Sequence, residues 1–361
     1  MNRLVLIGNG FDLAHGLKTS YKDFFYWYWK DRASHFYKEK GNVSVDPLCK
    51  LTILQDNSWP LFVFQHQFAL KKAEGKDLYQ LLTENPDSFE VNNTEFFANI
   101  CKSVETKQWV DIENEYYSLL VLLHSFVENN YLKLNKQLEH LRDKLITYLK
   151  SEESKNVSII PEIQDKIYCP IKKDEMAVEF IGHSDTNIPK EISPAAIMLL
   201  TFNYTSTPNQ YVSDSSPVKV NYIHGKLDDT KSVIFGYGDE LDEKYQKLRN
   251  SNDNECLRHI KSIRYLESDN YRRMLEFIES APFQICIMGH SCGNSDRTLL
   301  NTLFEHRNCV SIKPYFYINE RGEETYLELV QNISRNFTDM KLMRDRVVNK
   351  TYCEPLTNNK Q

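Results

Sequence analysis

Short apolar runs that end in glycine, asparagine or histidine recur along this chain and predict its strands. The first run, RLVLI at residues 3–7, is rich in branched side chains and stops at Gly8-Asn9-Gly10. Such runs are typical of strands that are buried on both faces of a parallel sheet. Similar runs lie at 196–204, 218–225, 232–238 and 283–291, and a weaker one lies at 312–319. The pattern therefore predicts an α/β fold with a mostly parallel sheet.

A different pattern separates the first predicted strand from the second. Between residues 60 and 150, apolar residues recur at helical spacing, and one stripe contains Trp109, Ile112, Tyr116, Leu119, Leu120 and Leu123. We expect this stripe to pack in a core rather than at an interface. Residues 151–195 are polar with scattered prolines, as in a connector, whereas the charged segment 240–280 looks helical again. The length of this connection predicts a large helical insertion after the first strand.

The predicted domains follow from these two patterns. Residues 1–50 and 190–340 form the α/β core, residues 51–189 form the mainly helical insertion, and residues 341–361 form a C-terminal tail. In an open parallel sheet, ligands bind at the carboxyl ends of the strands. Because the predicted strands end in glycine and polar residues, we expect a binding site at that edge.

Composition narrows the class of protein. The chain has 361 residues and a formal net charge of −6, so a broad nucleic-acid-binding face is not expected. Its eight cysteines include no C-x-x-C pair, no metal site is predicted, and Cys286 and Cys309 are expected to be reduced, buried thiols. The N-terminal apolar run is too short for a secretory segment, and nothing later approaches a membrane span. We expect a cytoplasmic protein without membrane association.

Glycines and hydrogen-bonding side chains at the predicted strand ends are the candidates for chemistry. Gly8 and Gly10 form a G-x-G turn that lets the backbone approach a phosphate, although the full dinucleotide fingerprint is incomplete. Asn203 orients a ribose hydroxyl or a water in one interpretation and caps a helix in the other. His224, followed by Gly225, is a candidate general base because histidine changes protonation state near neutral pH.

The segment from Gly289 to Gly293 fits G-x-S-x-G, the turn that carries the nucleophile of α/β-hydrolases. A hydrolase of this kind needs an acid and then a histidine later in the chain, and only His306 follows Ser291. A serine hydrolase is therefore a remote alternative. Gly289 and Ser291 are instead expected to contact phosphate or ribose, and Asp296 to cap the next helix or bind a hydroxyl group.

The order of these motifs resembles the bacterial abortive-infection protein AbiH family. The resemblance is carried by LVLIGNGFDLAHGLKTSYKDF, WVDIENEY, LLTFNYTST, YIHGKL, IFGYG and IMGHSCGNSD, which together run from residue 3 to about residue 310. It implies a role in defence against bacteriophage.

A more distant similarity is to sirtuins and sirtuin-like NAD-cleaving effectors. The spacing of the first glycine motif is similar, with Asp12 where those proteins have serine. This resemblance implies a Rossmann-like nucleotide-binding core, NAD as the substrate, and Asn203 and His224 as the catalytic pair. It also implies NAD contacts from Gly8, Asn9, Gly10, Asp12, Gly225, Gly289, Ser291 and Asp296. The paired cysteines of the sirtuin zinc module are absent, which argues against protein deacylation.

Two functions from different classes follow. The first is an effector that hydrolyses NAD to nicotinamide and ADP-ribose, a reaction that requires no metal. The alternative is a non-catalytic nucleotide-binding sensor or scaffold. In that case the helical insertion is expected to engage a phage-sensing partner protein or another copy of the chain.

Overall fold

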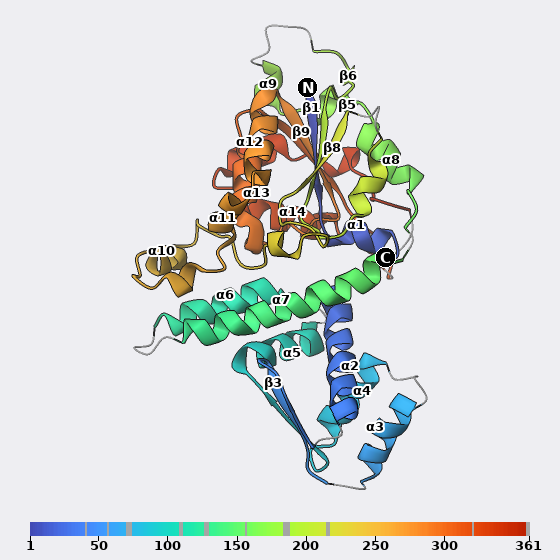
Figure 1. Cartoon of the computed structure of the whole chain (residues 1–361). Helices are drawn as coiled ribbons and strands as arrows, with labels where there is room; N and C mark the ends of the chain where they lie inside the picture. Colours follow the sequence, from blue (N-terminus) through green and yellow to red (C-terminus); the bar gives the residue numbers. More distant parts are fainter. Residues whose placement is uncertain are drawn as a thin grey trace. The chain divides into compact units, whose positions relative to one another are not determined.

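The computed structural model describes residues 1–39, 42–55, 58–69, 74–107, 111–125, 130–155, 157–182, 188–213, 217–319 and 321–358. The chain divides into two compact units, which are coloured along the sequence in Figure 1. Unit 1 contains Met1–Lys18, Leu149–Asn252 and His259–Gln361, and unit 2 contains Thr19–Tyr148 and Asp253–Arg258.

Unit 1 is built on a parallel sheet. Among the described residues, its five strands lie in the order β10-β9-β1-β7-β8, and all neighbours are parallel. The strands are β1 (Asn2–Ile7), β7 (Ile197–Thr201), β8 (Val218–Tyr222), β9 (Phe283–Met288) and β10 (Cys309–Tyr315). The α/β class and the parallel sheet that the apolar runs predict are confirmed.

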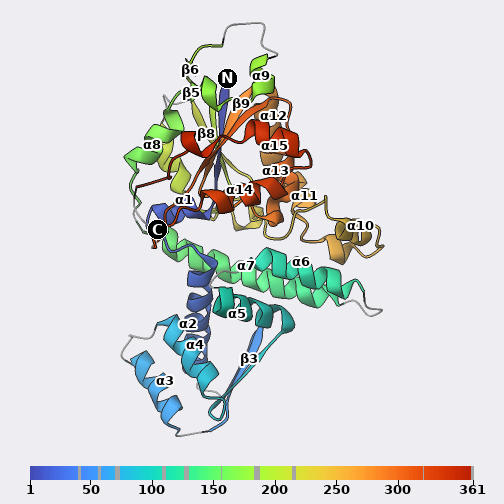
Figure 2. The ribbon, with the colours of Figure 1, turned by 180° about the vertical axis from the view of Figure 1, so that it is seen from behind.

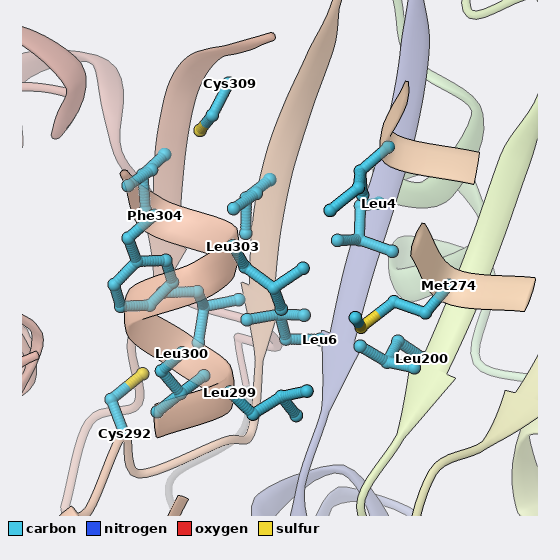
Figure 3. Packing of buried hydrophobic residues seen from close by; sticks show 14 of the residues in the cluster. Leu4, Leu6, Leu200, Met274, Cys292, Leu299, Leu300, Leu303, Phe304 and Cys309 are labelled. Atoms are coloured by element: carbon cyan, nitrogen blue, oxygen red, sulfur yellow. The ribbon is translucent and has the colours of Figure 1, made fainter. Parts of the chain in front are cut away.

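Helices cover both faces of this sheet, which explains why its central strands β1, β7 and β9 are apolar without alternation (Figures 1 and 2). All residues of β1 and β9 are buried. One face is covered by α12 (Asn270–Ser280), α13 (Arg297–Phe304), α14 (Tyr326–Arg335) and α15 (Met340–Arg346), and the other by α1 (Asn9–Ala14) and α8 (Pro161–Tyr168). Figure 3 shows Leu4 and Leu6 of β1 in the first of these cores, beside Leu303 of α13.

Shorter elements complete the described part of unit 1. They are β5 (Ile171–Lys172), β6 (Glu191–Ile192), α9 (Val178–Gly182), α10 (Glu243–Arg249), α11 (Lys261–Arg264) and the 3-10 segments η1 (Lys173–Glu175), η2 (Thr207–Tyr211), η3 (Thr230–Ser232), η5 (Tyr265–Glu267), η6 (Asn294–Asp296) and η7 (Lys350–Tyr352). The segment 151–195, which its polarity predicts to be a connector, is therefore partly regular.

The apolar run at residues 232–238 is not a strand of the sheet, and that prediction is wrong. The Ile234 N–H donates to the carbonyl oxygen of His224 (2.9 Å), and Tyr237 forms an isolated bridge with Ile260. The apolar composition of this run correctly indicates that it is buried. Its backbone is irregular, however, and buries these side chains without pairing with a strand of the sheet.

The last residues of the chain pack on the edge strand β10. Val347 forms a bridge with Ile312, and the Leu356 N–H donates to the carbonyl oxygen of Phe316 (2.7 Å). Leu356 also belongs to a core of unit 1. The segment 341–361, which the sequence predicts to be a tail, thus contributes buried contacts over its described residues.

Unit 2 combines helices with a small antiparallel sheet. Its elements are α2 (Tyr21–Glu39), β2 (Val43–Val45), β3 (Cys49–Ile53), α3 (Trp59–Ala69), α4 (Gly75–Glu84), β4 (Phe89–Asn93), α5 (Glu95–Lys107), α6 (Ile112–Leu123), η4 (Asn254–Leu257) and most of α7 (Tyr131–Glu153). β3 pairs with β2 and with β4. The helical spacing of apolar residues does not predict these strands.

The predicted apolar stripe lies on α6. Its buried members, as expected for a core, are Ile112, Tyr116, Leu119 and Leu120. Leu123 is half-buried, and Trp109 lies outside the described residues. Core packing is therefore confirmed for the part of the stripe that the structure describes.

The thiols of Cys286 and Cys309 are free and buried, as predicted. Burial raises the pKa of Cys286 to about 11 and that of Cys309 to about 12. Both side chains therefore remain protonated and act as small apolar groups at neutral pH.

Candidate functional site

The carboxyl ends of four strands lie in one row across the sheet. Ile7 is in register with Thr201 on one side and with Met288 on the other, and Thr201 is in register with Tyr222. The segments that follow these strands are therefore neighbours at one edge. The predicted site residues Gly8, Asn9, Gly10, Asp12, Asn203, His224, Gly225, Gly289, Ser291 and Asp296 all come from them.

The glycine turns after β1 and β9 pack backbone against backbone. A Cβ at Gly8 would lie 2.5 Å from the Cα of His290. One at Gly10 would lie 2.9 Å from the Cα of Gly289, and one at Gly289 would lie 2.1 Å from the nitrogen of Phe11. The N–H groups of Gly8 and Gly10 donate to carbonyl oxygens at the end of β9 (3.3 and 2.9 Å). The close contact between the two turns explains why these positions are glycine, since a side chain would not fit there. The N–H groups of Gly8 and Gly10 already have acceptors within the protein.

A buried carboxylate lies beside these turns. Asp12, in α1, is 1% exposed, and its Oδ2 accepts a hydrogen bond from the Thr205 hydroxyl (2.7 Å). Its Oδ1 has no hydrogen-bond partner among the described residues. Burial raises the pKa of Asp12 to about 6, against the nearby polar side chains of Thr205, Thr207 and Asn203, which act to lower it. One carboxylate oxygen of Asp12 is thus buried without a hydrogen-bond partner among the described residues, which is a destabilising arrangement.

Asn203 joins the end of β7 to the first glycine turn. Its Nδ2 donates to the carbonyl oxygen of Gly8 (2.9 Å), and its N–H donates to the Thr201 hydroxyl (3.1 Å). The 3-10 segment η2 begins further on, with Ser206 as its N-cap. The interpretation of Asn203 as a helix cap is therefore wrong, and its amide lies next to Asp12 instead.

His224 belongs to a buried cluster centred on Asp296. The Oδ1 of Asp296 lies 2.8 Å from Lys261 Nζ and 3.2 Å from His224 Nε2. Its Oδ2 lies 3.7 Å from His290 Nε2. None of these four side chains is more than 10% exposed. Asp296 occupies the N-cap position of α13, as predicted, but its side chain makes no capping bond there, and its carboxylate serves this cluster instead.

The charges in the cluster determine which groups carry protons. Burial acts to raise the pKa of Asp296, but Lys261 and then His224 hold this pKa well below its usual range. Burial and the Lys261 ammonium lower the pKa of His224, against the effect of the Asp296 carboxylate. His290 accepts the Cys292 N–H at Nδ1 (3.0 Å), which places the proton of the neutral ring on Nε2, toward Asp296. The cluster is thus a Lys–Asp ion pair in contact with a neutral His224.

Aromatic rings enclose His224. The Tyr265 ring stacks on it at 6.1 Å and 9°, with the hydroxyl oxygen 3.3 Å from Nε2. Phe202 meets the His224 ring edge-on at 5.2 Å and the His290 ring at 4.1 Å. Tyr271 stacks in turn on Tyr265 (5.4 Å). His224 is only 3% exposed, so a ligand reaches it only when part of this enclosure moves.

The geometry around Ser291 does not fit a serine hydrolase. Ser291 follows the carboxyl end of β9, is exposed, and accepts a hydrogen bond from Asn332 through its carbonyl oxygen (2.9 Å). His306 precedes β10, whose first residue pairs with the first residue of β9. The two residues therefore lie at opposite ends of a strand about 20 Å long. His306 contacts Glu279 there (3.2 Å), which leaves Ser291 without the later histidine that a triad requires.

Sequence reasoning missed Lys261 and Tyr265. Both lie in the segment 240–280, where the sequence shows only a charged, helical pattern. The Lys261 N–H donates to the carbonyl oxygen of Tyr237 (2.9 Å), and this bond places the ammonium beside Asp296. The available signal was a lysine directly after Ile260, and a lysine beside an apolar residue is too common to single out one position.

Two features of the described residues bear on the kind of protein. No group of three or more His, Cys, Asp or Glu side chains in that part of the chain is arranged to hold a metal ion. Within the same residues, no helix has both the length and the apolar character needed to cross a membrane.

The fold and the site define an α/β protein with a buried acid–base cluster at the carboxyl edge of a parallel sheet. The family model described as Bacteriophage abortive infection AbiH matches residues 4–318. The chain belongs to this family, and it is therefore a phage abortive-infection defence protein. No curated protein sequence matches it significantly. The family resemblance of the motifs is confirmed, whereas the similarity to sirtuin-like effectors stays a prediction.

Proposed function

We propose that this protein is an anti-phage effector that hydrolyses NAD to nicotinamide and ADP-ribose at the carboxyl edge of its parallel sheet. The observation that carries the proposal is the contact of a neutral, buried His224 with the Asp296 carboxylate. Asn203 and Asp12 lie at the same edge. Membership of the AbiH family supports the defence role.

The strand order supports a nucleotide as the ligand. Numbered along the chain, the strands of unit 1 lie in the order 5-4-1-2-3, as in a Rossmann-like sheet. Nucleotides bind such sheets where the order reverses, which is here between β1 and β9. We interpret unit 1 as a Rossmann-like core similar to that of sirtuin-like effectors, and most of unit 2 as an insertion after β1.

His224 has the role of general base in this proposal. When the N-glycosidic bond breaks, its electron pair leaves with nicotinamide as a neutral ring, so the leaving group needs no acid. A water oxygen forms the new bond to ribose C1′, and its proton passes to Nδ1 of His224. Asp296 accepts the Nε2–H of the same ring and stabilises the charge that the ring gains. Lys261 keeps Asp296 ionised.

Asp12 and Asn203 are assigned to the ribose. The free Oδ1 of Asp12 accepts a ribose hydroxyl, and Asn203 orients the sugar or the attacking water. The N–H groups of Gly8 and Gly10 are bonded to the β9 turn and do not form a phosphate cradle. The exposed Ser291 is therefore the candidate contact for the phosphate or adenosine side.

A second candidate is a non-catalytic nucleotide sensor or scaffold. The enclosure of His224 by Tyr265 and Phe202 favours it, because a ring closed to solvent at rest suits a structural role as well as a catalytic one. In that case the sheet edge binds a nucleotide without cleaving it, and signalling passes to a partner protein or a second copy.

Intracellular NAD, measured by mass spectrometry with and without phage, separates these functions. We expect NAD to collapse after infection in cells with the wild-type chain and to stay constant with His224→Ala. His224→Gln is the second test, because glutamine still donates to Asp296 but cannot accept a proton from water. His306→Ala, at the opposite end of the sheet, is the matched control and should lose NAD like the wild type.

Unchanged NAD in infected cells that are nevertheless protected would overturn the NAD assignment. If protection then also requires His224, the sheet edge is needed without hydrolysis, and the sensor is the correct function. Circular dichroism of each purified variant confirms that it is folded. NAD loss that persists with His224→Gln would remove His224 from the role of base.

A further inference from the structure

Unit 2 contains a cavity, widely open to solvent, that the sheet-edge site does not use. Its volume is about 390 Å³, within the range of small-molecule sites. It lies among β3, β4, the start of α7 and the turn before β3. The polar side chains that line it and carry the argument are Lys50, Asn92, Thr94, Lys133, Lys136 and Gln137.

Three lysines make this cavity basic in a chain whose net charge is −6. Lys133 and Lys136 are three residues apart on α7, so they share one face of the helix. Lys50, on β3, is in register with Asn92 of β4. None of the three forms an ion pair with any residue that the structure describes. Their ammonium groups are therefore available to an anion.

The carboxylate that lines the cavity does not cancel this charge. Asp46 is 8% exposed, and its Oδ2 lies 3.3 Å from both Arg32 Nε and His140 Nε2. Its Oδ1 accepts two backbone N–H groups of the following turn (2.8 and 2.9 Å). Since Arg32 already balances Asp46, the lysines are left in excess.

Gln137 is a buried amide that faces this cavity. It is 5% exposed, lies one turn after Lys133, and makes no side-chain hydrogen bond with the described residues. Its neighbour Asn135, equally buried, bonds to the Tyr116 hydroxyl (2.7 Å) and to Glu255 (2.9 Å). Because the Gln137 amide lines the cavity and no described residue engages it, it is suited to meeting a polar group of a ligand.

We propose that this cavity binds a small molecule that carries phosphate groups, of the size of a nucleotide. The lysines contact the phosphates as point charges, and Gln137 and Asn92 meet the polar groups of the remainder. A single cavity of this volume fits one small ligand, whereas a nucleic acid strand needs cations along an extended groove. The proposal is independent of NAD cleavage at the sheet edge.

Calorimetric titration of the full chain with ATP and with inorganic pyrophosphate tests this site. We expect both probes to bind and the affinity to fall as salt is added. The double substitution Lys133→Gln/Lys136→Gln should weaken both probes about tenfold or more. Gln137→Leu should weaken ATP more than pyrophosphate. Lys150→Gln removes the same charge further along α7 and should leave both affinities unchanged.

Affinities that are equal for the wild type and the double variant would place the ligand elsewhere and overturn the proposal. Failure of both ATP and pyrophosphate to bind the wild-type chain would also overturn the proposal. Binding of a single-stranded oligonucleotide in their place would identify a nucleic-acid surface instead. Thermal unfolding of each variant confirms that a lost affinity does not come from a lost fold. None of these results depends on His224, so the NAD proposal is tested separately.

Discussion

Asp12 offers a direct test of the electrostatics at the sheet edge. Its pKa in the folded protein is about 6, above the value of 3.8 for an ordinary aspartate, because the carboxylate is buried. The unfolded chain therefore releases this proton at a lower pH than the folded protein does. Stability falls as pH rises between these two values, and the loss is complete above the folded pKa.

The buried charge should lower the free energy of unfolding by about 3 kcal/mol at neutral pH. Asp12→Asn removes the charge and keeps an oxygen that accepts from Thr205. Any packing change made by the amide is independent of pH, so the informative quantity is the pH dependence of the difference between variant and wild type. From pH 4.5 to 7.5 this difference should move by about 2 kcal/mol in favour of the variant.

Thermal unfolding followed by circular dichroism measures this effect. For a unit of this size each kcal/mol moves Tm by about 2–4 °C, so the gap in Tm should widen by roughly 4–8 °C between the two pH values. Asp228→Asn, at an exposed position of the same unit, is the matched control and should show a constant gap. A constant gap for Asp12→Asn as well would mean that the carboxylate is not desolvated, and the reasoning would be refuted.

Two further substitutions test the cluster and the glycine turns. Lys261→Met leaves the buried Asp296 without its ammonium partner and should lower the free energy of unfolding by about 3–5 kcal/mol in urea titrations. Adding Asp296→Asn should restore much of that stability in the double variant. If the losses of the two single variants simply add in the double variant, the two residues do not form an ion pair. Gly289→Ala places a methyl group 2.1 Å from the Phe11 nitrogen and should cost more than about 4 kcal/mol. Gly16 has a similar φ of +80°, but a Cβ there would have no atom within 4 Å, so Gly16→Ala should cost only about 1–2 kcal/mol. Equal losses of stability in the two variants would show that backbone strain, and not the close contact, determines the cost.

Much of the parallel sheet could be predicted from the chain itself. Strands buried on both faces must be apolar along their length, and the runs at β1, β7 and β9 carry that signal, whereas the edge strand β8 alternates apolar and polar residues. The same signal failed at residues 232–238 because apolar composition reports burial and not strand pairing. The small sheet of unit 2 was missed since its strands are short and partly exposed, with only one buried residue in β2.

The candidate site was predictable only in part. Polar residues at the ends of parallel strands must meet at one edge, which is why Asn203 and His224 could be placed together from their positions alone. Asp296 shows the limit of this reasoning. A local rule assigned it to a helix end, but a lysine 35 residues away in the chain competes for the same carboxylate and wins.

The sequence by itself determined the fold class, the family and the segments that meet at the sheet edge, because these depend on the order and periodicity of residues along the chain. Only the tertiary structure decided what each group does there. It showed that Gly8 and Gly289 are glycines because two backbones touch, and that Lys261 sets the charge of the cluster. The physical reason is that packing and electrostatic energy depend on distances through space, which residues remote in sequence acquire only on folding.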